Sequence, residues 1–279
     1  MTVDIEIICV GNELLIGKIQ NTNAYWLTKQ ATQLGANVKR VTEIQDLIEE
    51  IANCICEAIE RKPQFIITTG GLGPTFDDKT LEGIAKGLNR KLDINLKALA
   101  IVKQRIVEYH KKRELSTEIE LTAPRVKMAT FPAATEVVNN PIGTAPGMRV
   151  DVQGTVLFAL PGVPVEMEAI FTETIAPLIK QAVGDKVFCE RSMFVENVME
   201  SYLAPLIDKV MSDNEGVYIK SHVCVKSHSQ MQNKPHIEIH LTIRAEEKEK
   251  PDEKLLKAML ELASLVEANG GKAIPEVLG

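Results

Sequence analysis

The chain has 279 residues, of which 45% are hydrophobic and 25% are charged, and a chain of this kind buries a sizeable core, which excludes global disorder. Its 32 basic and 38 acidic residues give a net charge of −6, which argues against a nucleic-acid coat or a basic membrane-surface protein. No window approaches the ~18 consecutive apolar residues of a membrane span. The N-terminus lacks the basic segment of a signal peptide, so we expect a cytoplasmic protein without membrane contact.

Strands and helices alternate through the first 90 residues. In chain order, strand and helix in turn, the predicted elements are Ile5–Val10, Asn21–Leu34, Val38–Val41, Leu47–Arg61, Phe65–Thr69 and Leu81–Leu88. Alternation of this kind predicts a parallel sheet that is covered by helices. A further helix at Leu96–His110 looks like an insertion, and a long helix follows Pro164. Between these two helices we predict four short strands, Val126–Met128, Val137–Val138, Met148–Val152 and Val156–Leu160.

The pattern changes near Gly184, where a small α+β module begins. Its predicted order is strand, helix, strand, strand, helix, with the elements Val187–Val195, Val198–Met211, Val217–Val225, Ile237–Ile243 and Leu255–Val266. Val198, Tyr202, Leu206 and Val210 would form the buried face of the first helix. We therefore predict two domains, residues 1–180 and residues 185–279.

Two glycine-rich segments follow the first and third predicted strands. Gly11–Lys18 resembles a P-loop but fails as one, because five residues separate its glycines and Ile19 stands at the Ser/Thr position that binds magnesium. A turn whose backbone lines a pocket fits this segment better. Thr68–Thr80 places three glycines in four residues ahead of a helix, which is typical of an anion site.

Asp77 and Asp78 stand beside this predicted anion site. In a purely structural interpretation, Thr75 caps the following helix and Asp78 completes a Thr-x-x-Asp capping box. That interpretation accounts for one acid but not for two adjacent acids beside a bound phosphate. A divalent cation or a proton would remove the repulsion, and we favour this functional interpretation.

Two further turns lie at predicted strand ends, at Asn139–Gly147 and at Leu160–Met167. Either could be a plain turn, but together they fit a ligand site at the carboxyl edge of an open sheet.

The four motifs together resemble the CinA family, whose N-terminal part is related to the molybdopterin-binding MogA/MoaB domain. The matching stretches are Val10–Gly17, Asn21–Leu27, Thr68–Thr80, Arg125–Pro132, Gly143–Gly147 and Leu160–Phe171. The resemblance implies a three-layer α/β domain with an open, mostly parallel sheet, followed by a KH-type α+β domain, and a cytoplasmic homodimer. No room remains for the nicotinamide-nucleotide amidase domain of full-length members, so we expect the short, archaeal-type form.

The resemblance also indicates which residues act. Asp46, Asp77 and Asp78 are the predicted catalytic residues, with Asp78 as a ligand of a divalent metal ion, either Mg, Co or Ni. Asp46 is set in Ile44-Gln45-Asp46-Leu47 where the family usually has Val-Gly-Asp-Asn. The predicted ligand contacts are Gly11, Glu13, Asn23, Gly70, Gly71, Leu72, Gly73, Pro74, Thr75, Lys127, Gly143, Thr144, Ala145, Pro146, Gly162, Pro164 and Glu166.

Two functions are compatible with these residues. In the first, the protein is a metal-dependent hydrolase of a nucleoside diphosphate linkage, similar to an ADP-ribose pyrophosphatase. In the second, it binds molybdopterin or a nucleotide in molybdenum cofactor biosynthesis, and its anion site holds the pterin phosphate. We expect no nucleic-acid partner, because a KH domain clamps RNA with a GXXG loop and residues 185–250 contain only Gly216.

Overall fold

The computed structural model describes residues 2–114, 120–224 and 236–275. These residues form two compact units, Met1–Val183 and Gly184–Gly279. None of the helices in the described ranges has the length and apolar composition that a bilayer crossing requires.

The first unit is built on a six-stranded sheet with the strand order β2-β1-β3-β8-β7-β6. The bounds are β1 (Asp4–Val10), β2 (Asn37–Ile44), β3 (Phe65–Thr69), β6 (Glu136–Val138), β7 (Gly147–Val152) and β8 (Thr155–Leu160). Neighbouring strands among β2, β1, β3 and β8 pair in parallel, whereas β7 and β6 are antiparallel to their neighbours. The sheet is therefore mixed and mostly parallel, as predicted. Thr69 pairs with both Cys9 and Leu160, so the three central strands end at one edge.

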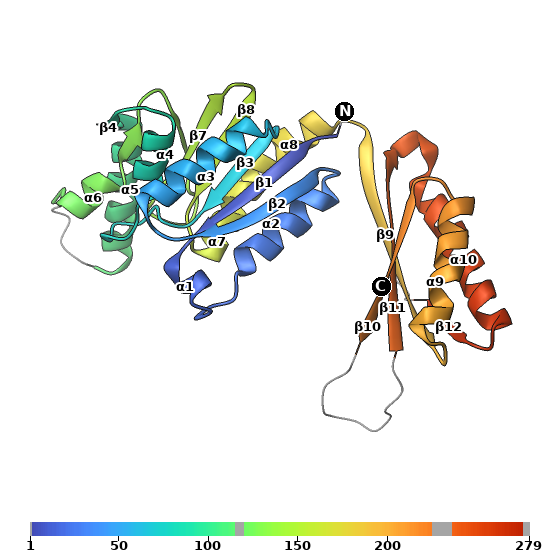
Figure 1. Ribbon diagram of the computed structural model, residues 1–279. Helices are drawn as coiled ribbons and strands as arrows, with labels where there is room; N and C mark the ends of the chain where they lie inside the picture. The colour runs from blue at the N-terminus through green and yellow to red at the C-terminus, as the bar shows by residue number, and fades with distance from the viewer. Residues whose placement is uncertain (1, 115–119, 225–235, 276–279) are drawn as a thin grey trace. The chain divides into compact units, whose positions relative to one another are not determined.

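Helices cover both faces of this sheet (Figure 1). One face packs against α3 (Ile48–Glu60), α4 (Thr80–Gly87) and α5 (Leu96–Lys112), and the other against α2 (Thr22–Gln33), α7 (Pro164–Ile170), the π-helical turn Phe171–Ile175 and α8 (Ala176–Val183). The central strands contribute side chains to the hydrophobic core on each face of the sheet. Ile8 and Ile66 face the first group of helices, and Ile7 and Ile67 face the second. This arrangement explains why these strands are continuous apolar runs.

A peripheral group of short elements lies beside α5. It contains β4 (Leu92–Ile94), which pairs with β5 (Thr130–Pro132), and the five-residue helix α6 (Ala123–Lys127). The strand predicted at Val126–Met128 is wrong, because most of it belongs to α6. Pro124 lies in the first turn of this helix, where its fixed φ is favourable, and a segment of three residues is too short to define a period.

The second unit is a four-stranded antiparallel sheet, ordered β10-β11-β9-β12. Its elements are β9 (Lys186–Glu196), α9 (Glu200–Asp213), β10 (Val217–Cys224), β11 (His236–Glu246), α10 (Pro251–Ala268) and β12 (Lys272–Pro275). The predicted order of elements is present, with β12 in addition. Val225, the last residue of the predicted third element, lies outside the described residues.

The buried face predicted for the first helix of this unit is partly wrong: Val210 is buried and Leu206 packs against the core, but Tyr202 does not. The inward side chains of α9 are Leu203, Ile207 and Val210, whereas Tyr202 is 65% exposed. A strict four-residue spacing drifts around a helix of 3.6 residues per turn, and Val198 precedes the helix.

Candidate functional site

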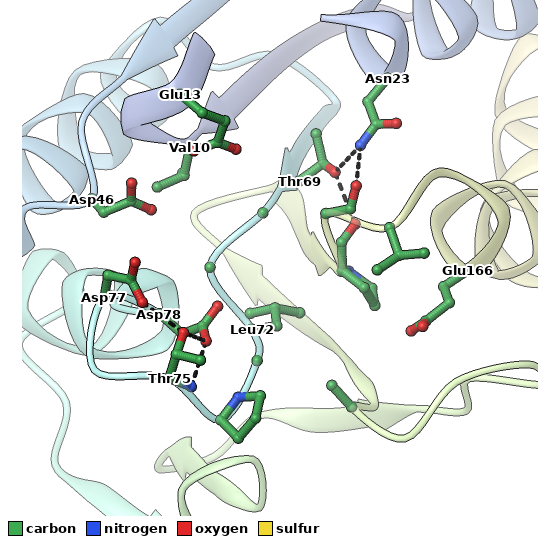
Figure 2. Close-up of a pocket in the computed structure, with 18 of the residues that line it drawn as sticks. Val10, Glu13, Asn23, Asp46, Thr69, Leu72, Thr75, Asp77, Asp78 and Glu166 are labelled. Carbon is green, nitrogen blue, oxygen red and sulfur yellow. Dashed lines mark hydrogen bonds between the residues drawn. The ribbon is translucent and has the colours of Figure 1, made fainter. Parts of the chain in front are cut away.

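A cavity of about 990 Å³ opens at the edge of the sheet where β1, β3 and β8 end. This is the position at which open α/β sheets bind ligands. Glycine-rich segments follow two of these strands, and Figure 2 shows the Gly70–Thr75 stretch crossing the middle of the cavity. In that view, Glu13, Asp46, Asp77 and Asp78 lie on one side of the stretch, and Asn23 and Glu166 lie on the other.

The first turn of the glycine loop (Gly70–Asp78) packs closely against the backbone of Val10 and the side chain of Thr80. Gly70 has a φ of 104°, and a Cβ there would lie 2.1 Å from the carbonyl oxygen of Val10. Its own carbonyl accepts a hydrogen bond of 2.7 Å from Oγ1 of Thr80. Gly71 has a φ of 67°, and a Cβ there would lie 2.3 Å from the same Oγ1. Glycine is therefore required at both positions.

The acidic end of the loop is a local, solvent-exposed turn. Oδ2 of Asp78 accepts a hydrogen bond of 2.7 Å from the backbone N–H of Thr75. The hydroxyl oxygen of Thr75 lies 2.6 Å from Oδ1 of Asp77 and 2.5 Å from Oδ2 of Asp78. One hydroxyl proton is thus placed between two carboxylates.

This turn corrects the capping-box interpretation. Helix α4 begins at Thr80 and has Lys79 as its N-cap, with no side-chain hydrogen bond at the cap. Thr75 therefore does not cap the helix, and Asp78, which directly precedes the N-cap, accepts the hydrogen bond from the N–H of Thr75.

Asp46 faces the same acids from another element. It precedes α3, and its Oδ2 accepts a hydrogen bond of 2.7 Å from the N–H of Asn12 in α1 (Asn12–Leu15). Partial burial raises the pKa of Asp46, and the charges of Glu13, Asp77 and Asp78 raise it further. In contrast, the hydrogen bond from Thr75 lowers the pKa of Asp77, as does the charge of Lys127. The pKa values of Asp46 and Asp77, which line one cavity, are therefore shifted in opposite directions.

The opposite wall of the cavity is organised by Asn140, which is fully buried. Its Nδ2 donates to the carbonyl of Ala145 at 2.8 Å and to Oε2 of Glu166 at 2.6 Å. Its Oδ1 accepts from the N–H groups of Ile142 and Gly143. One amide therefore fixes both the turn that ends at Gly147 and the carboxylate of Glu166.

Asn23 joins three elements at the same wall. Its Nδ2 donates to Oγ1 of Thr69 at 3.0 Å and to the carbonyl of Gly162 at 2.9 Å (Figure 2). Thr69 in turn donates to the carbonyl of Pro161 at 2.9 Å. The ends of β3 and β8 and the start of α2 are thereby tied together beside the cavity.

The structure brings most of the predicted site residues to this cavity. Those that line it are Glu13, Asn23, Asp46, Gly70, Gly71, Leu72, Gly73, Pro74, Thr75, Asp77, Asp78, Thr144, Ala145, Gly162, Pro164 and Glu166. Four predicted contacts are not among the lining residues, namely Gly11, Lys127, Gly143 and Pro146. Lys127 instead donates a hydrogen bond to the carbonyl of Thr75. Gly143 lies directly against the carboxylate of Glu166, with no room for a Cβ between them.

The predicted ligand contacts do not include Arg125, Thr69 or Asn140. Arg125 is the only cationic side chain among the described lining residues, which include five acids. Arg125 lies in α6, where the sequence predicts a strand at Val126–Met128 instead, so the direction of its side chain does not follow from the sequence. Thr69 was foreseeable as the last residue of a buried strand before Gly70.

No group of three or more His, Cys, Asp and Glu side chains is placed to hold a metal ion in the part of the chain that is described. The lining acids nevertheless supply hard oxygen donors, which suit Mg²⁺. Mg²⁺ is commonly bound by one or two carboxylates together with substrate phosphates, so a complete protein cage is not required.

The fold and the cavity define an α/β protein with a large cavity at the carboxyl edge of its sheet. Residues 6–181 match the family described as "Probable molybdopterin binding domain". The chain belongs to this MoaB/MogA-like family and is a CinA-like member of it.

The chain is similar to proteins of three organisms. A protein of Aeropyrum pernix is 40% identical over 97% of this chain and 96% of its own length. The crystal structure of CinA from Thermoplasma acidophilum, whose function is unknown, is 37% identical, covers 64% of this chain and 98% of that chain, and has a TM-score of 0.55. The molybdopterin biosynthesis enzyme MoaB of Thermus thermophilus is 16% identical over 65% of this chain and 94% of that chain, with a TM-score of 0.43.

Proposed function

We propose that the first unit binds a phosphate-bearing pterin of the molybdopterin type, or a related nucleotide, in the cavity at the sheet edge. The observation that carries this proposal is the glycine loop, which lines the cavity between the end of β3 and the start of α4. Glycines allow the backbone to approach a phosphate closely, and the N-terminus of the helix favours negative charge. The match to the molybdopterin-binding family over residues 6–181 supports the pterin as the ligand.

Binding can be tested by calorimetric titration with molybdopterin, AMP and ADP-ribose. Gly71→Ala should weaken binding at least 10-fold, because its Cβ would meet Thr80 and displace the loop. Gly184→Ala is the matched control, since Gly184 has a φ of 68° against 67° for Gly71 but no atom within 4 Å of its Cβ position. Absence of binding of all three ligands to the wild type would refute the proposal.

A second candidate is hydrolysis of a nucleoside diphosphate linkage such as that of ADP-ribose. The observation that favours it is that three aspartates, Asp46, Asp77 and Asp78, line one cavity together with Arg125, an arrangement that supplies carboxylates for a cation and a positive charge for a phosphate. A divalent ion would be held by Asp78 with Asp77 or Asp46, and when bound it would polarise the phosphoryl group. Arg125, which lines the same cavity, would stabilise negative charge on the phosphate.

One experiment distinguishes the two candidate functions. We propose incubation with ADP-ribose in the presence and absence of Mg²⁺, Co²⁺ or Ni²⁺, followed by chromatography of the products. Formation of AMP and ribose phosphate only with metal would establish the hydrolase. Binding without turnover would leave the ligand-binding function alone.

We also propose that the second unit is a KH-type domain without RNA affinity, and that the protein is a cytoplasmic homodimer. The strand and helix order of this unit supports the first statement, and the absence of glycines other than Gly216 in residues 185–250 argues against an RNA clamp. Filter binding with single-stranded RNA at low and physiological salt tests the RNA prediction. Light scattering at micromolar concentration tests the dimer, and a monomer mass would contradict it.

A further inference from the structure

The four-stranded sheet of the second unit has its two long helices on the same face. Helices α9 and α10 pack there against a core to which the strands contribute Met193, Ile219 and Ile239, among others (Figure 1). Successive side chains of a strand point to opposite faces, so the residues between these core positions form a second face, here called the open face. Its two central rows cross β10, β11 and β9 in that order, one with Tyr218, Thr242 and Glu190 and the next with Lys220, His240 and Ser192.

The open face has the composition of a protein interface. Tyr218 is 59% exposed, and Phe188 and Phe194 of β9 point to the same side of the sheet. When one face of an antiparallel sheet is solvated, that face is usually polar. Tyrosine, phenylalanine and arginine are residues that protein interfaces concentrate, and Arg244 stacks over the ring of Phe188 at 5.3 Å from its centroid. The open face therefore suits contact with another protein surface.

Two charged side chains of the open face, Lys220 and Glu190, are exposed and lack a side-chain partner within the described residues. Other charges of this face are paired within the unit, namely Glu238 with His240 at 3.0 Å and Glu196 with Lys272 at 3.7 Å. Lys220 and Glu190 lie on opposite sides of β11. Strands are ~4.8 Å apart, so the two side chains start about 10 Å from each other and do not form an ion pair within one chain.

We propose that the open face binds the same face of a second copy of this chain. A two-fold axis along β11 places β10 of each copy over β9 of the other, because these two strands flank β11. Packed sheets lie ~10 Å apart with their strands within ~30° of each other, so side chains from both faces fill the gap. Tyr218 then lies opposite the partner's Glu190, and Lys220, one row further along, reaches the same carboxylate. A two-fold contact forms each of these pairs twice.

The arrangement of charge favours a second copy over a polyanion. A nucleic acid requires a mainly basic face, whereas the open face carries carboxylates on both β9 and β11. A self-complementary face needs opposite unpaired charges on the two sides of its axis, as Lys220 and Glu190 provide. The strands cover about 500 Å² of sheet per copy at their usual spacings. This is less than the ~800 Å² per partner of a standard interface, so we expect a dimer that dissociates on dilution.

Charge reversal in the full-length protein tests this inference, which rests on the proposed homodimer and names the face through which it forms. The dissociation constant is measured by sedimentation equilibrium over a micromolar dilution series. Lys220→Glu and Glu190→Lys should each raise it at least 10-fold, because each change creates two contacts between like charges. High salt should shrink both effects by screening. Lys257→Glu is the matched control, since Lys257 is exposed on α10, which packs on the covered face.

A mixture of the two variants separates a lost contact from a damaged fold. In a heterodimer of one Lys220→Glu chain and one Glu190→Lys chain, both contacts again join opposite charges. The equimolar mixture should therefore dimerise with a dissociation constant within about 3-fold of the wild type. A chain that has failed to fold would not recover association in this way.

Each outcome decides between this face and the homodimer as such. If the wild type is a dimer that neither reversal weakens, the homodimer stands and the open face is not its interface. If both reversals weaken the dimer but the mixture does not recover it, the placement of β10 over β9 is wrong. A wild type that stays monomeric throughout the series refutes both the homodimer and its proposed interface, whereas recovery in the mixture supports them.

Discussion

The two walls of the main cavity are built in different ways. The glycine loop ends in hydrogen bonds between near neighbours, Thr75, Asp77 and Asp78, which lie at or near the surface. The opposite turn depends on Asn140, whose side chain is fully buried and makes bonds to four partners. One wall is therefore fixed by a buried polar group, and the other by carboxylates at or near the surface.

This difference between the two walls indicates that one has mainly a structural role and the other mainly a chemical role. A buried amide is costly to remove, since its partners are left without hydrogen bonds in a site that water does not reach. Exposed carboxylates contribute little to folding and remain able to bind a proton or a cation. We therefore expect substitutions in the Asn140 wall to affect mainly stability, and substitutions in the acidic wall to affect mainly ligand chemistry.

The largest expected effect is that of Asn140→Ala. It leaves the N–H groups of Ile142 and Gly143 and the carbonyl of Ala145 without partners, so the free energy of unfolding should fall by about 3 kcal/mol. Urea denaturation measures this loss. Asn139→Ala is a matched control, because Asn139 is the exposed neighbour and its replacement should change the free energy by less than about 0.5 kcal/mol. Equal effects of the two substitutions would contradict the difference between the walls.

The next effect concerns Gly143, which supports Glu166. A Cβ at this position would lie 1.9 Å from Oε2 of Glu166, whose position Asn140 fixes. Gly143→Ala should therefore cost about 2 kcal/mol of stability through overpacking. Glu166→Ala would remove the obstructing carboxylate, so the double variant should be more stable than the sum of the single changes predicts. If the stability changes of Gly143→Ala and Glu166→Ala simply add in the double variant, the close contact between these two residues does not affect stability.

Asp78→Asn is expected to have a smaller effect on stability and a large one on chemistry. Asparagine still accepts the hydrogen bond from the N–H of Thr75, so the free energy of unfolding should change by about 1 kcal/mol or less. If the protein is a metal-dependent hydrolase, turnover should fall ~10²-fold, because an anionic metal ligand is lost. Metal-free binding of a phosphate ligand should persist or tighten, since one repelling carboxylate is removed. Near-normal metal-dependent turnover with lowered thermal stability would restrict Asp78 to a structural role.

These walls also mark the limits of reasoning from sequence. The apolar runs Ile5–Val10 and Phe65–Thr69 predicted central strands because strands buried on both faces carry little other than apolar residues. The glycine loop was predictable for a related reason, since three glycines in four residues after a strand require an unusual turn.

Other features depend on contacts between distant segments. Asn140 reaches Glu166 across 26 positions, and Asp46 reaches Asn12 across 34, and no local pattern encodes either pairing. The sequence did not predict the peripheral elements α6 and β4 for a different reason, because both are too short to show a periodic pattern.

The smallest expected effect is a pH dependence that originates at Asp46. Burial and the charges of Glu13, Asp77 and Asp78 raise the pKa of this carboxyl in the folded state. The folded state therefore favours the protonated form, and this contribution to stability is lost as the pH rises through the folded-state pKa. Asp46→Asn keeps an acceptor for the N–H of Asn12 and removes the charge, so its melting temperature should exceed that of the wild type at pH 7.

The difference should shrink toward pH 3, where Asp46 is protonated in both folded and unfolded states. Asp93→Asn, on the exposed strand β4, controls for loss of one negative charge at a distance. Mg²⁺ should raise the melting temperature of the wild type more than that of Asp46→Asn, because a cation relieves the repulsion that the substitution has already removed. A melting difference that is independent of pH would show that the acids of this wall do not interact in the folded protein, and the exposed wall would then lack the charge coupling on which its proposed chemistry depends.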